Sequence, residues 1–166
     1  TSNPIHVKKK VGYLPENVGF YDDLTGLQNL VFTGQLNSYS AKEAKEKAEF
    51  FLEKVGMSEN AGKKTLKYSR GMLQRLGLAD VLIKNPEVII LDEPTLGIDP
   101  SGVREFLELI VRLSREQGIT VLFCSHHLHQ VQQVCDRVGI FVRGKLIAEG
   151  NIQTLSENLF SGSPYS

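Results

Sequence analysis

The sequence has few of the features that mark secreted, membrane-spanning or nucleic-acid-binding proteins. Its only two cysteines, Cys124 and Cys135, lack a metal-type spacing, which favours a reduced cytosolic protein. Acidic and basic residues balance at 19 each, so the net charge attracts neither nucleic acid nor anionic lipid. No apolar run approaches the roughly 20 residues of a membrane span, and direct membrane insertion is not expected.

Two further absences concern the start of the chain and phosphate binding. The sequence opens TSNPIHVKKK without a methionine, a signal-peptide apolar region or a capped element, and we expect it to come from within a longer protein. The triphosphate-binding loop G-x-x-x-x-G-K-[ST] is missing. Its nearest imitation, AGKKT at 61–65, has Lys64 where serine or threonine is required, and Met57 where the first glycine is required. We therefore expect residues 61–65 to form a polar loop.

The periodicity of the remaining residues predicts an α/β protein. Short apolar runs at 11–14, 87–92 and 119–124 predict strands, and they alternate with helices, which implies a parallel sheet covered on both faces. Residues 22–84 read as an all-helical insertion in this sheet. One of its helices begins after Ser40, which forms a capping-box pattern with Glu43 three residues later.

The segment after residue 85 returns to alternating strands and helices. We expect helices over 99–118 and 125–138, two short strands over 139–150, and a last helix over 151–160. A further helix of the insertion is expected to begin at Ser69 and to end before Pro86.

Two adjacent carboxylates, Asp92 and Glu93, directly follow the apolar run Val88–Leu91. Ligands of parallel α/β sheets bind beyond the carboxyl ends of the strands. An acid pair there can bind Mg²⁺ through one carboxylate and orient a water molecule through the other, as phosphoryl transfer requires. The alternative, that the carboxylates only cap the following turn, stays open from these residues alone.

Five segments resemble, in order, the motifs of the ATP-binding-cassette (ABC) ATPases. They are GYLPENVGFYDDLT (12–25, Q-loop region), YSRGMLQRL (68–76, signature), VIILDEP (88–94, Walker B), GIDP (97–100, D-loop) and CSHHL (124–128, switch histidine). The resemblance covers nearly the whole chain, and YSxGM and GYLPE are most similar to the ATPase subunits of ABC exporters.

The resemblance implies a partial P-loop NTPase core with a parallel sheet and an inserted α-helical subdomain. Residues 1–21 would end the first part of the catalytic core and include the Q-loop. Residues 22–84 would be the helical subdomain with the signature, and residues 85–166 the C-terminal part of the core. Because the family's phosphate cradle lies upstream of the Q-loop, the chain alone is expected to be inactive.

The resemblance also implies ATP and Mg²⁺ as ligands. Asp92 would hold Mg²⁺, Glu93 would polarise the attacking water, and His126 would steady the γ-phosphate. Ser69 and Gly71 lie at a helix start, where backbone N–H groups favour anions, and would close the site of a second ATPase domain. An ordinary N-cap serine is the alternative for Ser69.

Two residues differ from those usual in the family motifs, and two further features allow a second interpretation. Arg70 replaces the first signature glycine and is a candidate phosphate or partner contact. Glu16 replaces the usual glutamine, so it is a possible Mg²⁺ ligand or a solvated loop residue. Asp99 would belong to the loop that crosses the dimer interface, or simply begin a helix before proline. The histidines beside His126 are interpreted as polar surface, not as a metal site.

These residues favour the ATP-hydrolysing subunit of an ABC transporter of exporter type. Its expected partners are a transmembrane subunit on another polypeptide and a second ATPase domain, in a homodimer or heterodimer. The subunit would be cytoplasmic and peripheral, held on the inner face of the membrane by its partner. A soluble ABC ATPase of translation or DNA repair, and a non-catalytic regulatory or interaction fragment, are the alternatives.

Overall fold

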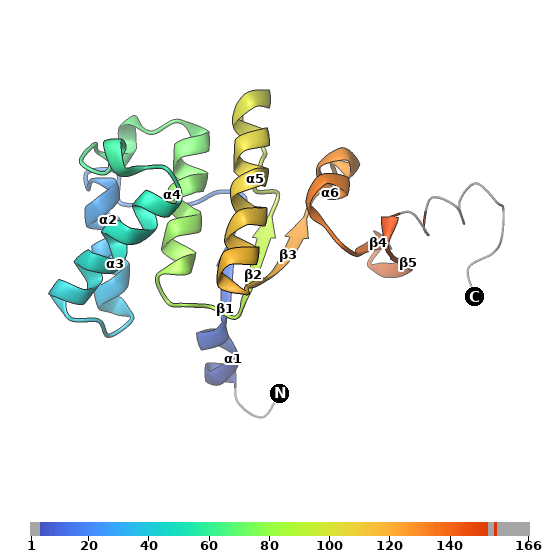
Figure 1. The fold of residues 1–166 in the computed structure, drawn as a ribbon, viewed down its shortest axis with the longest axis horizontal. Coiled ribbons are helices and arrows are strands. Elements are labelled where there is room, and N and C mark those ends of the chain that lie inside the picture. The colour runs from blue at the N-terminus through green and yellow to red at the C-terminus, as the bar shows by residue number, and fades with distance from the viewer. Residues whose placement is uncertain (1–3, 153–154, 156–166) are drawn as a thin grey trace. The chain divides into compact units, whose positions relative to one another are not determined.

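The computed structural model of the chain describes residues 4–152 and 155. The chain divides into two compact units, Thr1–Ser125 and His126–Ser166, and each is described here by itself. The first unit contains the sheet with its helices, and the second contains a short helix and a hairpin (Figure 1).

Three parallel strands form the sheet of the first unit, in the order β1-β2-β3. They are β1 (Val11–Leu14), β2 (Val88–Asp92) and β3 (Thr120–Cys124). The register places Tyr13 beside Ile90 and Ile90 beside Leu122. The predicted α/β class and its parallel sheet are therefore confirmed.

The predicted helical insertion lies between β1 and β2. Its helices are α2 (Gly26–Leu36), α3 (Ala41–Lys54) and α4 (Arg70–Leu82), with short 3-10 turns at Ser58–Asn60 and Thr65–Lys67. α3 begins at the expected capping box, in which the Ser40 hydroxyl accepts from the Glu43 N–H and the Glu43 carboxylate accepts from the Ser40 N–H. α2 begins at a second capping box, formed by Thr25 and Gln28.

The apolar side chains of α3 recur at helical spacing and are buried: Ala44, Ala48, Phe51 and Leu52. α2 lies beside α3 (Figure 1). A Cβ atom at Gly34 of α2 would come within 2.8 Å of the Ala44 Cβ of α3, so a glycine is needed for the two helices to approach this closely. The insertion thus builds much of its own core.

Helices cover only one face of the sheet among the described residues of this unit. α4 and α5 (Pro100–Gln117) pack on that face, where the apolar side chains that meet include Leu78, Leu82, Ile89, Leu91, Ile110 and Leu113. On the other face Tyr13 is 52% exposed and Leu122 53% exposed. The expectation of a sheet covered on both faces is not met here, because the insertion packs largely on itself and does not add a second layer.

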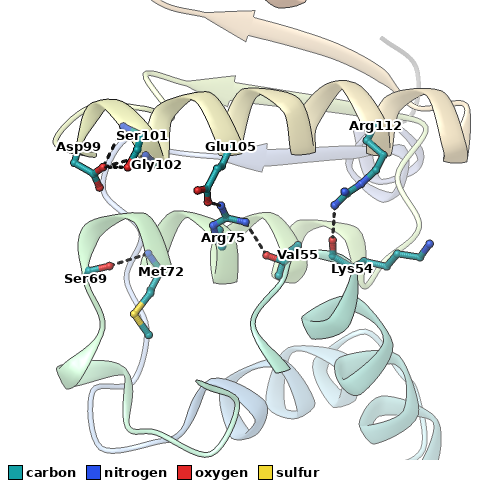
Figure 2. A network of polar contacts seen from close by, with 10 residues as sticks. All are labelled: Lys54, Val55, Ser69, Met72, Arg75, Asp99, Ser101, Gly102, Glu105 and Arg112. Carbon is teal, nitrogen blue, oxygen red and sulfur yellow. Dashed lines mark hydrogen bonds and ion pairs between the residues drawn. The ribbon is translucent and has the colours of Figure 1, made fainter. Parts of the chain in front are cut away.

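Two arginines join the end of α3 to α5 (Figure 2). Arg75 of α4 donates to the Val55 carbonyl at 3.1 Å and to the Glu105 carboxylate of α5 at 2.9 Å. Arg112 of α5 donates to the Lys54 carbonyl at 3.3 Å. These bonds satisfy carbonyls at the C-terminus of α3 that have no partner within the helix. The helical insertion is therefore tied to the helix that follows β2.

The ends of the chain differ from expectation in two ways. The first residues contain a seven-residue helix, α1 (Pro4–Lys10), which no cap or apolar stripe announces in the sequence. In the second unit α6 (Leu128–Val134) is shorter than the predicted 125–138, and no side chain caps its start. The expected last helix at 151–160 falls on residues of which the structure describes only 151, 152 and 155.

The two predicted strands of the second unit form a hairpin. β4 (Val138–Val142) and β5 (Lys145–Gly150) pair antiparallel. Across residues 4–152 and 155, no helix has both the length and the apolar character that a membrane crossing needs.

Asp80 of α4 is expected to destabilise the first unit at neutral pH. Burial raises the pKa of this carboxyl group, against the opposing effects of a hydrogen bond with Thr33 and the charge of Lys84. Its Oδ1 atom is buried without a hydrogen-bond partner in the described structure. The folded state therefore holds the proton more tightly than the unfolded chain, so ionised Asp80 lowers stability above its raised pKa.

We therefore expect Asp80→Asn to raise the melting temperature at pH 7, because it removes the buried charge, by about 2–4 °C if that charge costs about 1 kcal/mol. The gain should shrink as the pH falls from the raised pKa towards the ordinary carboxyl value, because wild-type Asp80 then becomes neutral in the folded state. Thermal unfolding monitored by circular dichroism measures it. Asp22→Asn, at an exposed carboxylate, is the control. A gain that is the same at pH 7 and pH 4 would contradict the assignment.

Candidate active site at the end of the central strand

The paired carboxylates lie at the carboxyl end of the central strand. Asp92 is the last residue of β2 and pairs with Cys124 of β3. Its Oδ2 atom accepts a hydrogen bond of 2.9 Å from the Tyr13 hydroxyl of β1. The same bond is the main cause that raises the pKa of Tyr13, because the hydroxyl proton is held by the carboxylate. Asp92 is thus oriented from a neighbouring strand while its other oxygen makes no bond to Tyr13.

Glu93 follows in a left-handed backbone conformation with φ of +45°, which is unusual for a residue other than glycine. Its N–H donates to the Cys124 carbonyl at 2.9 Å, and its own carbonyl accepts from the Leu96 N–H at 3.1 Å. The Ser125 hydroxyl donates to the Glu93 carboxylate at 3.4 Å. Residues with strained backbones gather at functional sites, where surrounding contacts hold them in place.

The chemistry of these oxygen atoms fits a magnesium ion. Mg²⁺ prefers carboxylate oxygens and usually binds through one or two of them together with water and substrate phosphates. The described residues contain no group of three His, Cys, Asp or Glu side chains able to hold a metal. Asp92 and Glu93 would therefore supply part of a shell that phosphate and water complete.

Ser69 is exposed and forms the N-cap of α4. Its hydroxyl accepts a bond of 3.3 Å from the Met72 N–H (Figure 2). Gly71 lies in the same first turn of the helix. The structure therefore contains the ordinary N-cap that was the alternative reading for Ser69. A capped helix start still presents backbone N–H groups to an anion, so its role towards phosphate stays a prediction.

Arg70 points its guanidinium group at other parts of the chain. Its Nε donates to the Leu96 carbonyl at 3.2 Å, one terminal nitrogen to Asn17 Oδ1 at 2.9 Å, and the other to the Glu16 carbonyl at 2.6 Å. Three of its five N–H groups are used in this way. The proposed phosphate contact stays a prediction, but the observed contacts are within the chain.

Glu16 follows β1 and is held mainly through its backbone. Its carbonyl accepts from Arg70 and, at 2.8 Å, from the buried Gln74 side chain. Its carboxylate accepts only a long contact of 3.5 Å from the neighbouring Asn17 amide among the bonds described. The backbone position is therefore fixed, while the side chain has the freedom that a metal ligand or a solvated residue would each have.

Asp99 caps α5 (Figure 2). Its Oδ1 atom accepts from the Ser101 N–H at 3.1 Å, the Ser101 hydroxyl at 2.7 Å and the Gly102 N–H at 3.0 Å. The Gly102 N–H, followed by the Ser101 hydroxyl, lowers the pKa of Asp99. The helix-entry alternative is thus realised, and a role at a dimer interface stays a prediction.

His126 begins the second unit and is exposed. Its ring lies against that of His127, with 4.0 Å between the centroids. The relation of His126 to the γ-phosphate stays a prediction that rests on the resemblance alone.

The sequence reasoning missed Tyr13, Asn17 and Ser125, whose side chains contact predicted site residues. A signal existed for two of them. Tyr13 of β1 pairs with Ile90, which lies two residues before Asp92 on β2, so Tyr13 and Asp92 share a face of the sheet. Ser125 directly follows β3, at the same edge of the sheet. Once the strand order is known, both are expected near the acid pair.

Comparisons with known proteins point to one family. A family model described as ABC transporter matches residues 2–96, and one described as an AAA domain, putative AbiEii toxin of a type IV toxin–antitoxin system, matches residues 65–129. A solved structure titled as cbiO1 of Clostridium perfringens, part of the ABC transporter complex cbiONQ, superposes with a TM-score of 0.83 at 29% identity. It covers 92% of this chain and 61% of that one.

Curated relatives carry related names. An uncharacterised ABC transporter ATP-binding protein of Synechocystis is 42% identical over 91% of this chain and 43% of its own length. The linearmycin resistance ATP-binding protein of Bacillus subtilis is 39% identical over 92% of this chain and 49% of its own length. The bacitracin transport ATP-binding protein of Enterococcus faecalis is 41% identical over 88% of this chain and 46% of its own length. The chain thus spans about half the length of these relatives. Together with the family match over more than half of its residues, they show that the chain belongs to the family of ABC transporter ATPase domains.

Proposed function

We propose that this chain is part of the ATP-hydrolysing subunit of an ABC transporter of exporter type. The observation that carries the proposal is the acid pair Asp92-Glu93 at the end of the central parallel strand, with one carboxylate oriented by Tyr13 and the other by Ser125. Ligands of such sheets bind at this edge. The names of the relatives from Bacillus subtilis and Enterococcus faecalis, which refer to antibiotic resistance and transport, favour the exporter type.

The proposed division of the chain follows the motifs. Residues 1–21 would include the Q-loop, residues 22–84 the signature-bearing helical subdomain, and residues 85–166 the C-terminal part of the catalytic core. The glycine-rich cradle that holds a triphosphate has no counterpart in these 166 residues. ATP binding would therefore require a further segment in the complete protein.

Each site residue has a task that its surroundings permit. Asp92 would bind Mg²⁺ through the carboxylate that Tyr13 orients, with Glu16 as a second possible ligand. A bound Mg²⁺ neutralises charge on the phosphates during phosphoryl transfer. Glu93 would accept the proton of the attacking water as the general base, and its carboxylate accepts a hydrogen bond of 3.4 Å from the Ser125 hydroxyl.

Other residues would act on the phosphates or across a dimer. His126 would donate a hydrogen bond to the γ-phosphate. The starts of α4 and α5 lie on the same side of the unit, with Ser69 and Asp99 as their caps (Figure 2). Ser69 and Gly71 would meet the nucleotide of a second ATPase domain, and Asp99 would lie in the loop facing that domain.

A transmembrane subunit would be the second partner. In this proposal it contacts the helical subdomain and holds the protein on the cytoplasmic face of the membrane. The solved neighbour is described as part of a transporter complex, which supports such an arrangement for this chain.

The test is to purify the full-length protein with an affinity tag from detergent-solubilised membranes. We expect Mg²⁺-dependent ATP hydrolysis and co-purification of a multi-span membrane protein. The 166-residue chain, which has no phosphate cradle, is the control and should show no turnover and no thermal shift of several degrees with Mg-ATP. Hydrolysis by a protein that purifies without membranes would favour a soluble ABC ATPase. An absence of hydrolysis in the full-length protein would favour a regulatory role.

A further inference from the structure

Arg70 makes contacts that neither its motif nor the proposed function explains. The family's usual glycine at this position has no side chain, whereas Arg70 reaches two separate loops. The first loop follows β1 and contains Glu16 and Asn17. The second follows β2 and contains Glu93 and Leu96. Both loops leave adjacent parallel strands, so they lie at the same edge of the sheet.

The link to the loop after β2 leads directly to the acid pair. Arg70 Nε donates to the Leu96 carbonyl, and the Leu96 N–H donates to the Glu93 carbonyl. This short turn holds Glu93 in its left-handed conformation. A displacement of Leu96 would therefore also move the Glu93 backbone, and with it the Glu93 carboxylate.

The link to the loop after β1 is double. Arg70 donates to the Glu16 carbonyl and to the Asn17 side chain, and Gln74, one helical turn further along α4, donates to the same Glu16 carbonyl. Gln74 is 1% exposed, so its bond is shielded from water. Residues four apart on a helix share a face, so Arg70 and Gln74 can both bind the loop that contains Glu16.

We propose that Arg70 is a positioning residue that ties the signature start of α4 to both loops beside the acid pair. It sits between Ser69 and Gly71, so it couples their position to that of Glu16 and Glu93. Its planar, branched guanidinium group suits three acceptors in different directions, which a lysine ammonium on a flexible stem does not. This inference rests on the proposed function for its catalytic consequence, but the link itself does not.

The chain offers a matched control in Arg75. It lies on the same helix, is also half-buried, and also donates to one backbone carbonyl and one side chain. Its partners are Val55 and Glu105, which belong to neither loop. Arg75→Ala therefore removes comparable bonds of α4 without touching the link.

The first measurement is amide hydrogen exchange at Leu96 and Ile98 in the full-length protein. Both amides are bonded within the turn, to Glu93 and Thr95. We expect exchange about tenfold faster in Arg70→Ala and unchanged in Arg75→Ala, because a lost hydrogen bond shifts a local opening equilibrium by about that factor. Unchanged exchange in Arg70→Ala would overturn the proposal.

The second measurement is steady-state ATP hydrolysis. We expect Arg70→Ala to lower kcat about tenfold or more with little change in KM, because in this proposal the residue acts by positioning Glu93 and not by a contact to the nucleotide. A raised KM with unchanged kcat would instead identify a phosphate contact and overturn the proposal. Arg70→Lys should restore only part of the rate, and full restoration would overturn the proposal, because the charge alone would then be sufficient.

Asn17→Ala provides a variant that removes only one end of the link. Its effect on kcat should be smaller than that of Arg70→Ala, and the two should be less than additive when combined. Full additivity would contradict a shared link. If the wild-type protein does not hydrolyse ATP, the proposed function fails, while the exchange measurement still decides whether the link exists.

Discussion

Replacing Glu93 by glutamine should lower ATP turnover by the full-length protein by about 10²–10⁴-fold, the usual cost of losing a general base. Glutamine has nearly the same shape and can still accept the Ser125 hydrogen bond, so the site should keep its geometry. It cannot accept a proton from the attacking water. A phosphate-release assay with saturating Mg-ATP measures the loss, which should appear in kcat and not in KM.

The same strand supplies a control for this substitution. Glu87 directly precedes β2, at the end opposite the acid pair, and its exposed side chain pairs with Lys10. Glu87→Gln should leave turnover unchanged, since an exposed ion pair contributes little to stability. Near-normal turnover in Glu93→Gln would remove Glu93 from the role of general base, and an equal loss in both variants would point to a general defect in folding.

Features of the fold that depend on neighbouring residues were predictable from the sequence. The capping box at Ser40 requires only a glutamate three residues on, and the N-caps at Ser69 and Asp99 are visible in the same way. The coverage of the sheet was not predictable in this manner. It depends on whether the helices of residues 22–84 pack on the sheet or on one another, and that choice is made by close approaches such as the one at Gly34.

In the candidate site too, the residues marked by their sequence neighbours were predictable, and the contacts that depend on the fold were not. Asp92 and Glu93 could be found because an apolar run leads straight into them. The contact between Tyr13 and Asp92 joins residues 79 positions apart and requires the strand register. The direction of Arg70 was hidden for another reason: two of its three acceptors are backbone carbonyls, which every residue has and no motif marks.

The asymmetry of the sheet leads to the second prediction. Leu91 of β2 is 0% exposed and faces α4 and α5, whereas its neighbour Ile90 is half-buried and lies on the face with Tyr13 and Leu122. Leu91→Ala should lower the free energy of unfolding of this chain by about 2–5 kcal/mol, because it removes buried apolar contacts and leaves a cavity. Urea denaturation followed by circular dichroism measures the loss.

Ile90→Ala is the matched comparison, and it should cost about 1 kcal/mol or less, mainly through weaker strand propensity and partial burial. The two residues are adjacent on β2, so we expect both substitutions to affect the pairing of this strand with its neighbours equally. Their difference therefore reports which face of the sheet is covered. Similar costs for both variants would mean that the face of Ile90 is covered in solution too, for example by a second copy of the chain. A cost that then falls on dilution would identify such a copy, because the stability of an associated state depends on protein concentration.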